Sequence, residues 1–294
     1  MAERLAPREI KAIFPAIIAA MKLRTEPHIC AIYGAFDENF GELVGSSTLL
    51  SLRGETFLLT ADHVARAKLL PDSSGSGLRY VGIAHTTRNG EPPCMISAPI
   101  YGMSDPYDLA LIPVDVRTLD RVPLDAGLLA TNSNLTNRDI LFIQGLPGAR
   151  SHSFFGVHSD TLPYATGPGT STFAWFDPKI HFAIDYAPNG LVDEKGDAID
   201  MVNPHGLSGS AVWATGRCTT GDAWNSSLAR VVGVIHNWDE QSQSLVGTRI
   251  EAVREFALHV VRSRHAYSEW ERRGRPVGDD WTDWLSAVQA IPGL

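Results

Sequence analysis

The middle of the chain alternates short apolar runs with stretches rich in turn-forming residues. Val, Ile, Leu and aromatic residues dominate the runs, and Asp, Asn, Gly and Ser fill the stretches between them. This pattern is typical of antiparallel strands. In the first part of the chain we expect strands at 28–33, 42–50, 55–60, 78–85, 94–99 and 109–113. About six strands can close a barrel, so residues 27–113 are predicted to form a first β-barrel.

A second group of apolar runs follows a segment without clear periodicity. Residues 114–136 carry charges and turn formers, which suits a connection between two barrels. After it, strands are expected at 140–148, 152–158, 171–176, 180–186, 210–214, 229–236 and 244–250. Residues 137–250 are therefore predicted to form a second barrel.

Both ends of the chain have helical periodicity. Within residues 1–26, apolar side chains recur at intervals of three and four between Ile10 and Met21, which predicts a helical extension packed against the body. Pro15 interrupts this run, and the run is too short to span a bilayer, so we do not expect a signal peptide or a membrane anchor.

Residues 251–294 are expected to form two helices. The first begins near Ile250, after the last strand, and the second begins at Asp279 or Asp280. One face of the second helix should carry Trp281, Trp284, Leu285 and Val288. We expect this face to be buried, because a large apolar face in water favours association.

Composition narrows the functional class. The chain has 294 residues, of which 44% are hydrophobic and 20% charged, as in ordinary globular proteins. Its net charge of −8 argues against a nucleic-acid partner, which requires a basic face. The cysteines at 30, 94 and 218 are too few and too widely spaced for a disulfide framework or a zinc site. We therefore expect a cytoplasmic protein, with secretion as the alternative.

Three segments carry residue types suited to nucleophilic catalysis. Ser208 lies in residues 203–213, close to Gly206 and Gly209, just before an apolar run. A serine hydroxyl needs a base to take its proton, and backbone amides to receive the oxyanion that forms. Upstream, His63 follows Thr-Ala-Asp, and Asp108 precedes Leu-Ala-Leu-Ile. Along the chain the three residues occur in the order His, Asp, Ser, and this order differs between the families of enzymes that use a catalytic triad.

Together these segments resemble the trypsin-like (chymotrypsin-fold) serine peptidases over residues 27–264. The resemblance implies an all-β fold of two antiparallel six-stranded barrels with a helix at each end. It also implies that His63, Asp108 and Ser208 form the triad, and that the amides of Gly206 and Ser208 form the oxyanion hole. Gly-Leu-Pro at 145–147 most resembles the start of the second barrel in bacterial glutamyl-endopeptidase-like members. The implied function is a serine endopeptidase that forms an acyl-enzyme on a protein or peptide substrate, without a cofactor or metal.

The resemblance leaves the specificity pocket open. His236 follows Gly233 in a strand that resembles the family's pocket-lining strand, in which a histidine binds Glu or Gln at P1, the substrate residue before the scissile bond. Asn203 and His205 could line the same S1 pocket. Two residues separate Gly233 from His236 where those relatives have one, so His236 could instead point into the core. Many activated zymogens of this family have aspartate directly before the serine, where this chain has Leu207. In this respect the chain resembles the bacterial and viral members that are not made as zymogens.

Several alternatives compete with this interpretation. Asp105 could replace Asp108, and Ser210 could replace Ser208. An α/β-hydrolase would combine Ser208 with Asp239 and with His259 or His265, but that family needs Gly-x-Ser-x-Gly before a helix. A catalytically silent scaffold that binds peptides or a partner protein is the alternative from another class. Because a cytosolic peptidase must be restrained, we expect a regulated bacterial system, such as stress response or phage defence, and a possible regulatory partner.

Overall fold

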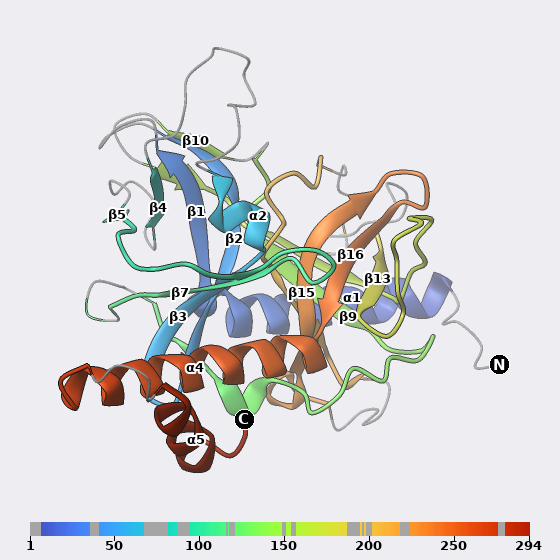
Figure 1. Ribbon diagram of the computed structural model, residues 1–294. Helices are drawn as coiled ribbons and strands as arrows, with labels where there is room; N and C mark the ends of the chain where they lie inside the picture. Colours follow the sequence, from blue (N-terminus) through green and yellow to red (C-terminus); the bar gives the residue numbers. More distant parts are fainter. Residues whose placement is uncertain are drawn as a thin grey trace.

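The computed structural model has two mostly antiparallel β-sheets and a helix near each end of the chain (Figure 1). It describes residues 7–35, 41–67, 82–86, 94–115, 117, 121–148, 151–153, 157–186, 195, 197, 202–217, 224–275 and 280–294. The expected loop at 72–77 and Cys218 lie outside the described residues. The fold class expected from the sequence is confirmed.

The first sheet contains eight strands where six were expected. Its order is β5-β4-β1-β2-β3-β7-β6, with β8 pairing in parallel with β2. The strands are β1 (Ile29–Ala35), β2 (Gly41–Leu52), β3 (Glu55–Thr60), β4 (Gly82–Thr86), β5 (Cys94–Met95), β6 (Tyr101–Met103), β7 (Leu109–Pro113) and β8 (Leu124–Asp125). The additional strands are β6 and β8, which are short. Because β3 pairs antiparallel with β7, the end of β3 lies beside the start of β7.

The second sheet contains six strands in the order β12-β9-β14-β15-β16-β13. They are β9 (Leu141–Gly145), β12 (Leu162–Thr166), β13 (His181–Asp185), β14 (Ala211–Ala214), β15 (Arg230–Asp239) and β16 (Ser244–Arg249). The run expected as one strand at 152–158 is instead a separate hairpin of β10 (Ser151–Ser153) and β11 (Val157–Ser159).

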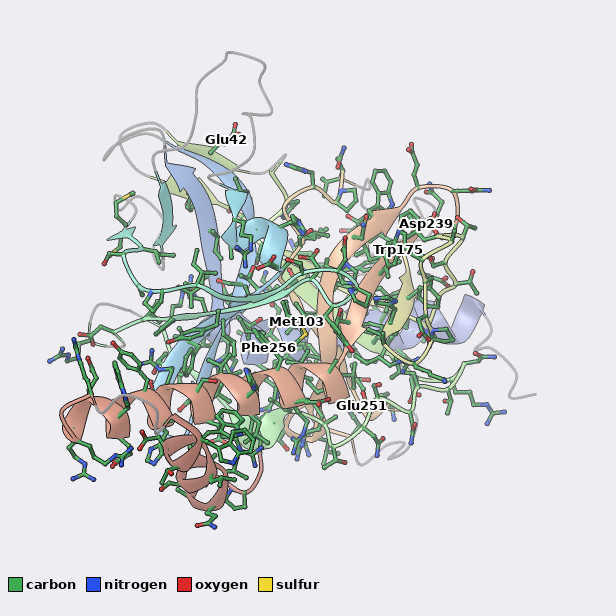
Figure 2. The ribbon with its side chains drawn as sticks, viewed as in Figure 1. Glu42, Met103, Trp175, Asp239, Glu251 and Phe256 are labelled. Carbon is green, nitrogen blue, oxygen red and sulfur yellow. The ribbon has the colours of Figure 1, made fainter. Side chains whose placement is uncertain are left out.

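The strand expected at 171–176 is absent, and this prediction was wrong. The segment is irregular because it bonds to a side chain rather than to a neighbouring strand. The Asp239 carboxylate at the end of β15 accepts hydrogen bonds from the Ser171 hydroxyl at 2.9 Å and from the amide and hydroxyl of Thr172. Figure 2 labels Asp239 where β15 ends.

Helices lie on the outside of the sheets. They are α1 (Pro7–Thr25), the short α2 (Asp62–Ala65), α4 (Ile250–Arg272) and α5 (Asp280–Ala290), with single turns η1 (Glu26–His28), η4 (Ala126–Leu128) and η7 (Ser226–Leu228). The start of α4 agrees with the predicted closing helix. None of the helices in the described ranges is long and apolar enough to cross a membrane.

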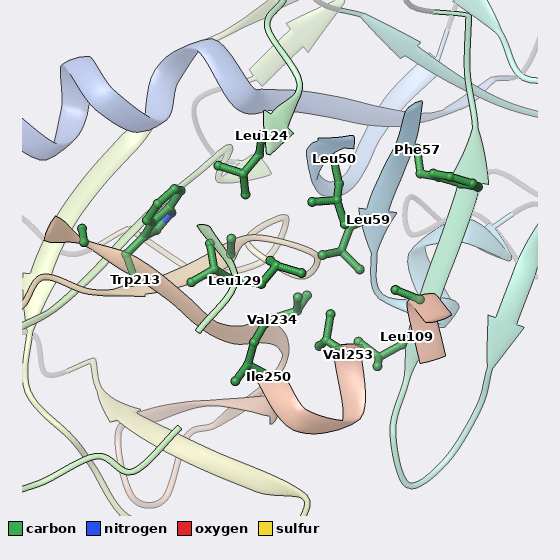
Figure 3. Close-up of a cluster of buried hydrophobic side chains, with 14 of the residues drawn as sticks. Leu50, Phe57, Leu59, Leu109, Leu124, Leu129, Trp213, Val234, Ile250 and Val253 are labelled. Carbon is green, nitrogen blue, oxygen red and sulfur yellow. The ribbon is translucent and has the colours of Figure 1, made fainter. Parts of the chain in front are cut away.

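One large hydrophobic cluster joins both sheets to the helices (Figure 3). Leu50 and Leu59 come from the first sheet, Trp213 and Val234 from the second, and Val253 from α4. Fully burying one such side chain stabilises a fold by about 1.5–3 kcal/mol. The cluster therefore fixes the two sheets relative to each other, which matters for a site built from both.

The segment at 114–136 passes from one sheet to the other. Leu124 in β8 pairs with β2, and Leu129 forms a bridge with Val231 in β15. This course suits the expected connection, although the boundaries at 113 and 137 stay predictions.

The buried face of α5 differs from the expected one. Trp281 is 71% exposed and Leu285 46% exposed, whereas Asp283 and Ala287 are buried. Asp283 forms an ion pair with Arg273 at the end of α4 at 2.6 Å. Trp284 and Val288 are partly buried, and the Trp284 ring packs against His259 of α4, with ring centroids 5.4 Å apart. The expected burial of this face on the body of the protein is therefore only partial.

Candidate active site

Strand pairing brings His63 and Asp108 together. His63 lies in α2, just after β3, and Asp108 directly precedes β7. The imidazole Nδ1 of His63 lies 2.7 Å from Oδ2 of Asp108, and the His63 amide donates to Oδ1 at 2.9 Å. When Nδ1–H donates to the carboxylate, Nε2 carries the lone pair that can accept a proton. This is the tautomer that a general base requires.

The Asp108 carboxylate is held in its charged form. Burial raises the pKa of Asp108, but the hydrogen bonds from the side chain and amide of His63 and the nearby charges of His63 and His236 outweigh it, so the pKa is lowered overall. An ionised Asp108 can stabilise the imidazolium that forms when His63 takes a proton.

The loop that carries Ser208 makes two tight turns. Leu207 donates its amide to the carbonyl of Pro204 at 2.9 Å, and Ser210 donates to that of Leu207 at 3.0 Å. Gly206 has φ +95°, and a Cβ there would lie 2.6 Å from the carbonyl oxygen of Leu146. Only glycine fits this position without strain. Within the described ranges, the amides of Gly206 and Ser208 donate a hydrogen bond to no other group.

Ser46 in β2 holds this loop against the first sheet. Its hydroxyl donates to the Gly206 carbonyl at 2.8 Å and accepts from the Leu146 amide at 2.9 Å, while its amide donates to the Ser208 carbonyl at 2.8 Å. These bonds fix two carbonyls of the nucleophile loop. Sequence analysis missed Ser46, and no motif could have identified it, because its partners lie about 100 and 160 residues away.

A cavity of about 630 Å³ joins the expected site residues. Its lining includes His63, Asp108, Ser208, Asn203, His205 and His236. The Ser208 hydroxyl donates to the carbonyl of His236 at 3.3 Å, and the described residues show no bond from it to His63. The hydroxyl would have to leave this carbonyl before it could bond to the imidazole. Catalytic hydrogen bonds often tighten only when substrate is bound.

His236 lies in a β-bulge, where the pairing of β15 and β16 shifts register between Ile235 and Asn237. This bulge accounts for the extra residue noted in the sequence. The His236 side chain is 4% exposed, its Nδ1 lies 3.8 Å from Oδ2 of Asp108, and its ring centroid lies 5.6 Å from that of His181. Burial lowers the pKa of His236 to about 4, although the Asp108 charge opposes this shift. The ring is therefore neutral at neutral pH.

The residues that could replace the proposed acid, nucleophile or base lie in different surroundings. Asp105 is exposed, whereas Asp108 contacts His63. Ser210 is buried, and a Cβ on Gly145 would lie 2.1 Å from its hydroxyl. His259 packs against Trp284 on the helical side, with ring centroids 5.4 Å apart.

The α/β-hydrolase alternative finds no support at Asp239. The Asp239 carboxylate is engaged by Ser171 and Thr172, so it does not orient a histidine as the α/β-hydrolase alternative requires. In the part of the chain that is described, no three His, Cys, Asp or Glu side chains are placed to hold a metal ion.

No family model and no curated protein matches this chain, but solved structures do. The serine protease domain of the Sesbania mosaic virus polyprotein is 16% identical, with a TM-score of 0.42, covering 77% of this chain and 90% of its own. A Glu endopeptidase is 16% identical, with a TM-score of 0.43 and coverages of 80% and 90%. The tobacco vein mottling virus protease is 8% identical, with a TM-score of 0.41 and coverages of 77% and 78%. These similarities are too distant to assign a role to any residue.

Proposed function

We propose that this protein is a serine endopeptidase that acts through an acyl-enzyme on Ser208. The observation that carries the proposal is the pair of hydrogen bonds from His63 to Asp108, which fixes the basic tautomer of an imidazole lining the same cavity as Ser208. The unengaged amides of Gly206 and Ser208 supply the second requirement for acyl transfer.

The proposed reaction has two halves. The Ser208 oxygen attacks the peptide carbonyl while Nε2 of His63 takes the hydroxyl proton, and the amides of Gly206 and Ser208 stabilise the oxyanion. His63 then gives the proton to the leaving amine, and the C–N bond breaks. Water, deprotonated by His63, attacks the ester, and the returning proton restores Ser208 as the acid product leaves.

The cavity lining favours an uncharged polar residue at P1. Among the described residues, its wall contains no carboxylate apart from Asp108, which His63 engages, so these residues would offer a Lys or Arg side chain no free counter-ion. Asn203 and His205 supply polar groups. His236 is neutral and packs beside Asp108, which favours its structural alternative over a direct role in binding a charged Glu.

One observation favours the second candidate, a silent scaffold that binds peptides. The Ser208 hydroxyl bonds to the His236 carbonyl rather than to a base. A fluorophosphonate probe separates the candidates, because it labels a serine only when that serine is activated. We expect labelling of the wild type and of Ser210→Ala, but not of Ser208→Ala. Failure to label the folded wild type would favour the scaffold.

A further inference from the structure

The loop that delivers Asp108 is held in an unusual backbone conformation. It connects β6 to β7, and Asp108 has φ +47°, in the left-handed region. A residue with a side chain pays about 1 kcal/mol or more there, so neighbouring contacts must hold it. Ser104, at the start of this loop, makes such contacts.

Asp62, the residue before His63, binds this loop. Its side chain is 5% exposed, and Nε of Arg66 lies 2.8 Å from both of its oxygens. The Ser104 hydroxyl donates to Oδ2 of Asp62 at 2.9 Å. A buried carboxylate is tolerated only when it is paired and hydrogen-bonded, and here both requirements are met.

The neighbouring strand leaves room for this carboxylate. A Cβ on Gly102 in β6 would lie 1.9 Å from Oδ1 of Asp62 and 2.7 Å from a terminal nitrogen of Arg66. A side chain at position 102 would displace the buried Asp62 carboxylate and its partner Arg66. The local sequence is therefore adapted to place a carboxylate next to the loop.

Ser104 transmits this contact to the triad acid. While its hydroxyl binds Asp62, its carbonyl accepts the amides of Tyr107 at 3.2 Å and of Asp108 at 3.4 Å. Two consecutive residues of α2 thus bind the two ends of one loop, Asp62 at Ser104 and His63 at Asp108.

We propose that Asp62 and Ser104 are positioning residues that set the geometry of the Asp108–His63 pair. The inference rests on the proposed function for its kinetic consequence, but not for its structural one. Without the Ser104 hydroxyl, the turn loses one of its two attachments to α2, and the Asp108 carboxylate gains freedom to move relative to Nδ1 of His63. Displacements of about 1 Å at a reacting group can cost about 100-fold in rate.

The test compares Ser104→Ala with Ser104→Thr, which keeps the hydroxyl, and with Asp115→Ala as the control. Asp115 forms an exposed ion pair with Arg117 and follows β7 at the end opposite to Asp108. We expect Ser104→Ala to lower kcat about 10- to 100-fold with KM little changed, and Ser104→Thr to restore most of it. Asp115→Ala should behave as wild type.

A readout independent of turnover separates this inference from the proposed function. The proton between His63 Nδ1 and Asp108 can be followed by NMR, and its exchange with water should be several-fold faster in Ser104→Ala. If the wild type cleaves nothing but this exchange quickens, the positioning role stands and the proposed function fails. Unchanged kcat and exchange in Ser104→Ala, even with lower thermal stability, would overturn the inference. If Ser104→Ala does not fold, Asp62→Asn, which retains the shape, is measured against the same criteria.

Discussion

The imidazole of His181 in β13 donates Nε2–H to the carbonyl of Pro106 at 2.6 Å. Its Nδ1 accepts the amide of Asp177 at 3.0 Å, which fixes this neutral tautomer. Thr248 in β16 also donates its hydroxyl to the carbonyl of Tyr107. The loop carrying Asp108 belongs to the first sheet, so these bonds from the second sheet make the site depend on how the two sheets meet.

Replacing His181 by Phe should lower both the stability of the fold and the activity. The Pro106 carbonyl would lose its donor, at a cost of about 1–3 kcal/mol, and the Asp108 loop would loosen. We expect kcat to fall about 10-fold in a peptide-cleavage assay. His181→Gln, which can place an amide N–H near the same carbonyl, should recover part of the loss. Equal rates for the Phe variant and wild type would show that this bond does not support the site.

Replacing Ser208 by Ala should lower kcat roughly 10⁶-fold, because residues that act as one catalytic unit fail together. Asp108→Asn should cost about 10⁴-fold, since it favours the wrong tautomer of His63. Both variants should keep the circular dichroism spectrum of the wild type. If Ser208→Ala retained substantial turnover while Ser210→Ala lost it, the nucleophile would be Ser210.

Replacing Ser46 by Ala should disturb the nucleophile loop, because its hydroxyl bonds both Gly206 and Leu146. Ser47 is the matched control: it is equally buried, but among the described residues its hydroxyl bonds only the Cys30 carbonyl, at 3.1 Å. Each alanine variant should lose about 1–2 kcal/mol of unfolding free energy. Only Ser46→Ala should lose more than about 10-fold in kcat/KM, and a similar kinetic loss in both would indicate a general effect of stability.

Stability should fall on acidification because of His236. The pKa of this ring is about 4 in the fold, against about 6.5 in an unfolded chain. Between these pH values the unfolded state binds more protons, so the free energy of unfolding decreases as pH falls from 6.5 toward 4, by up to about 3 kcal/mol. Asp108 opposes this effect and His181 and His63 reinforce it.

Denaturant titrations of wild type and His236→Gln measure this contribution. The variant should be less sensitive to pH between 6.5 and 4, because the titrating ring is absent. The lowered pKa of Asp108 stabilises the fold above the pKa of an unfolded Asp, near 3.9, and this contribution is lost as pH falls through the lower folded value. It therefore lies below the window in which His236 acts. Parallel curves for the two proteins would contradict the buried neutral state of His236.

Much of the architecture could be predicted from local sequence patterns. Apolar runs between turn residues gave the order of most strands, and three-and-four spacing gave α1 and α4, because these periodicities reflect backbone geometry. The triad candidates could be named because His63 and Asp108 each adjoin a strand, while Gly206 marks a turn that needs positive φ. The cytoplasmic location, the regulatory partner and the role in stress or phage defence remain predictions.

The tertiary structure decided the contacts between distant residues. The sequence alone left His236 with two alternatives, and its bulge and its contact with Asp108 became visible only in the tertiary structure. The hydrogen bond from the Ser46 amide to the Ser208 carbonyl could not be predicted from the sequence, and neither could the burial of Asp283 in place of Trp281. The physical reason is that periodicity tells which residues share a face, whereas the partner of that face depends on how separate elements pack.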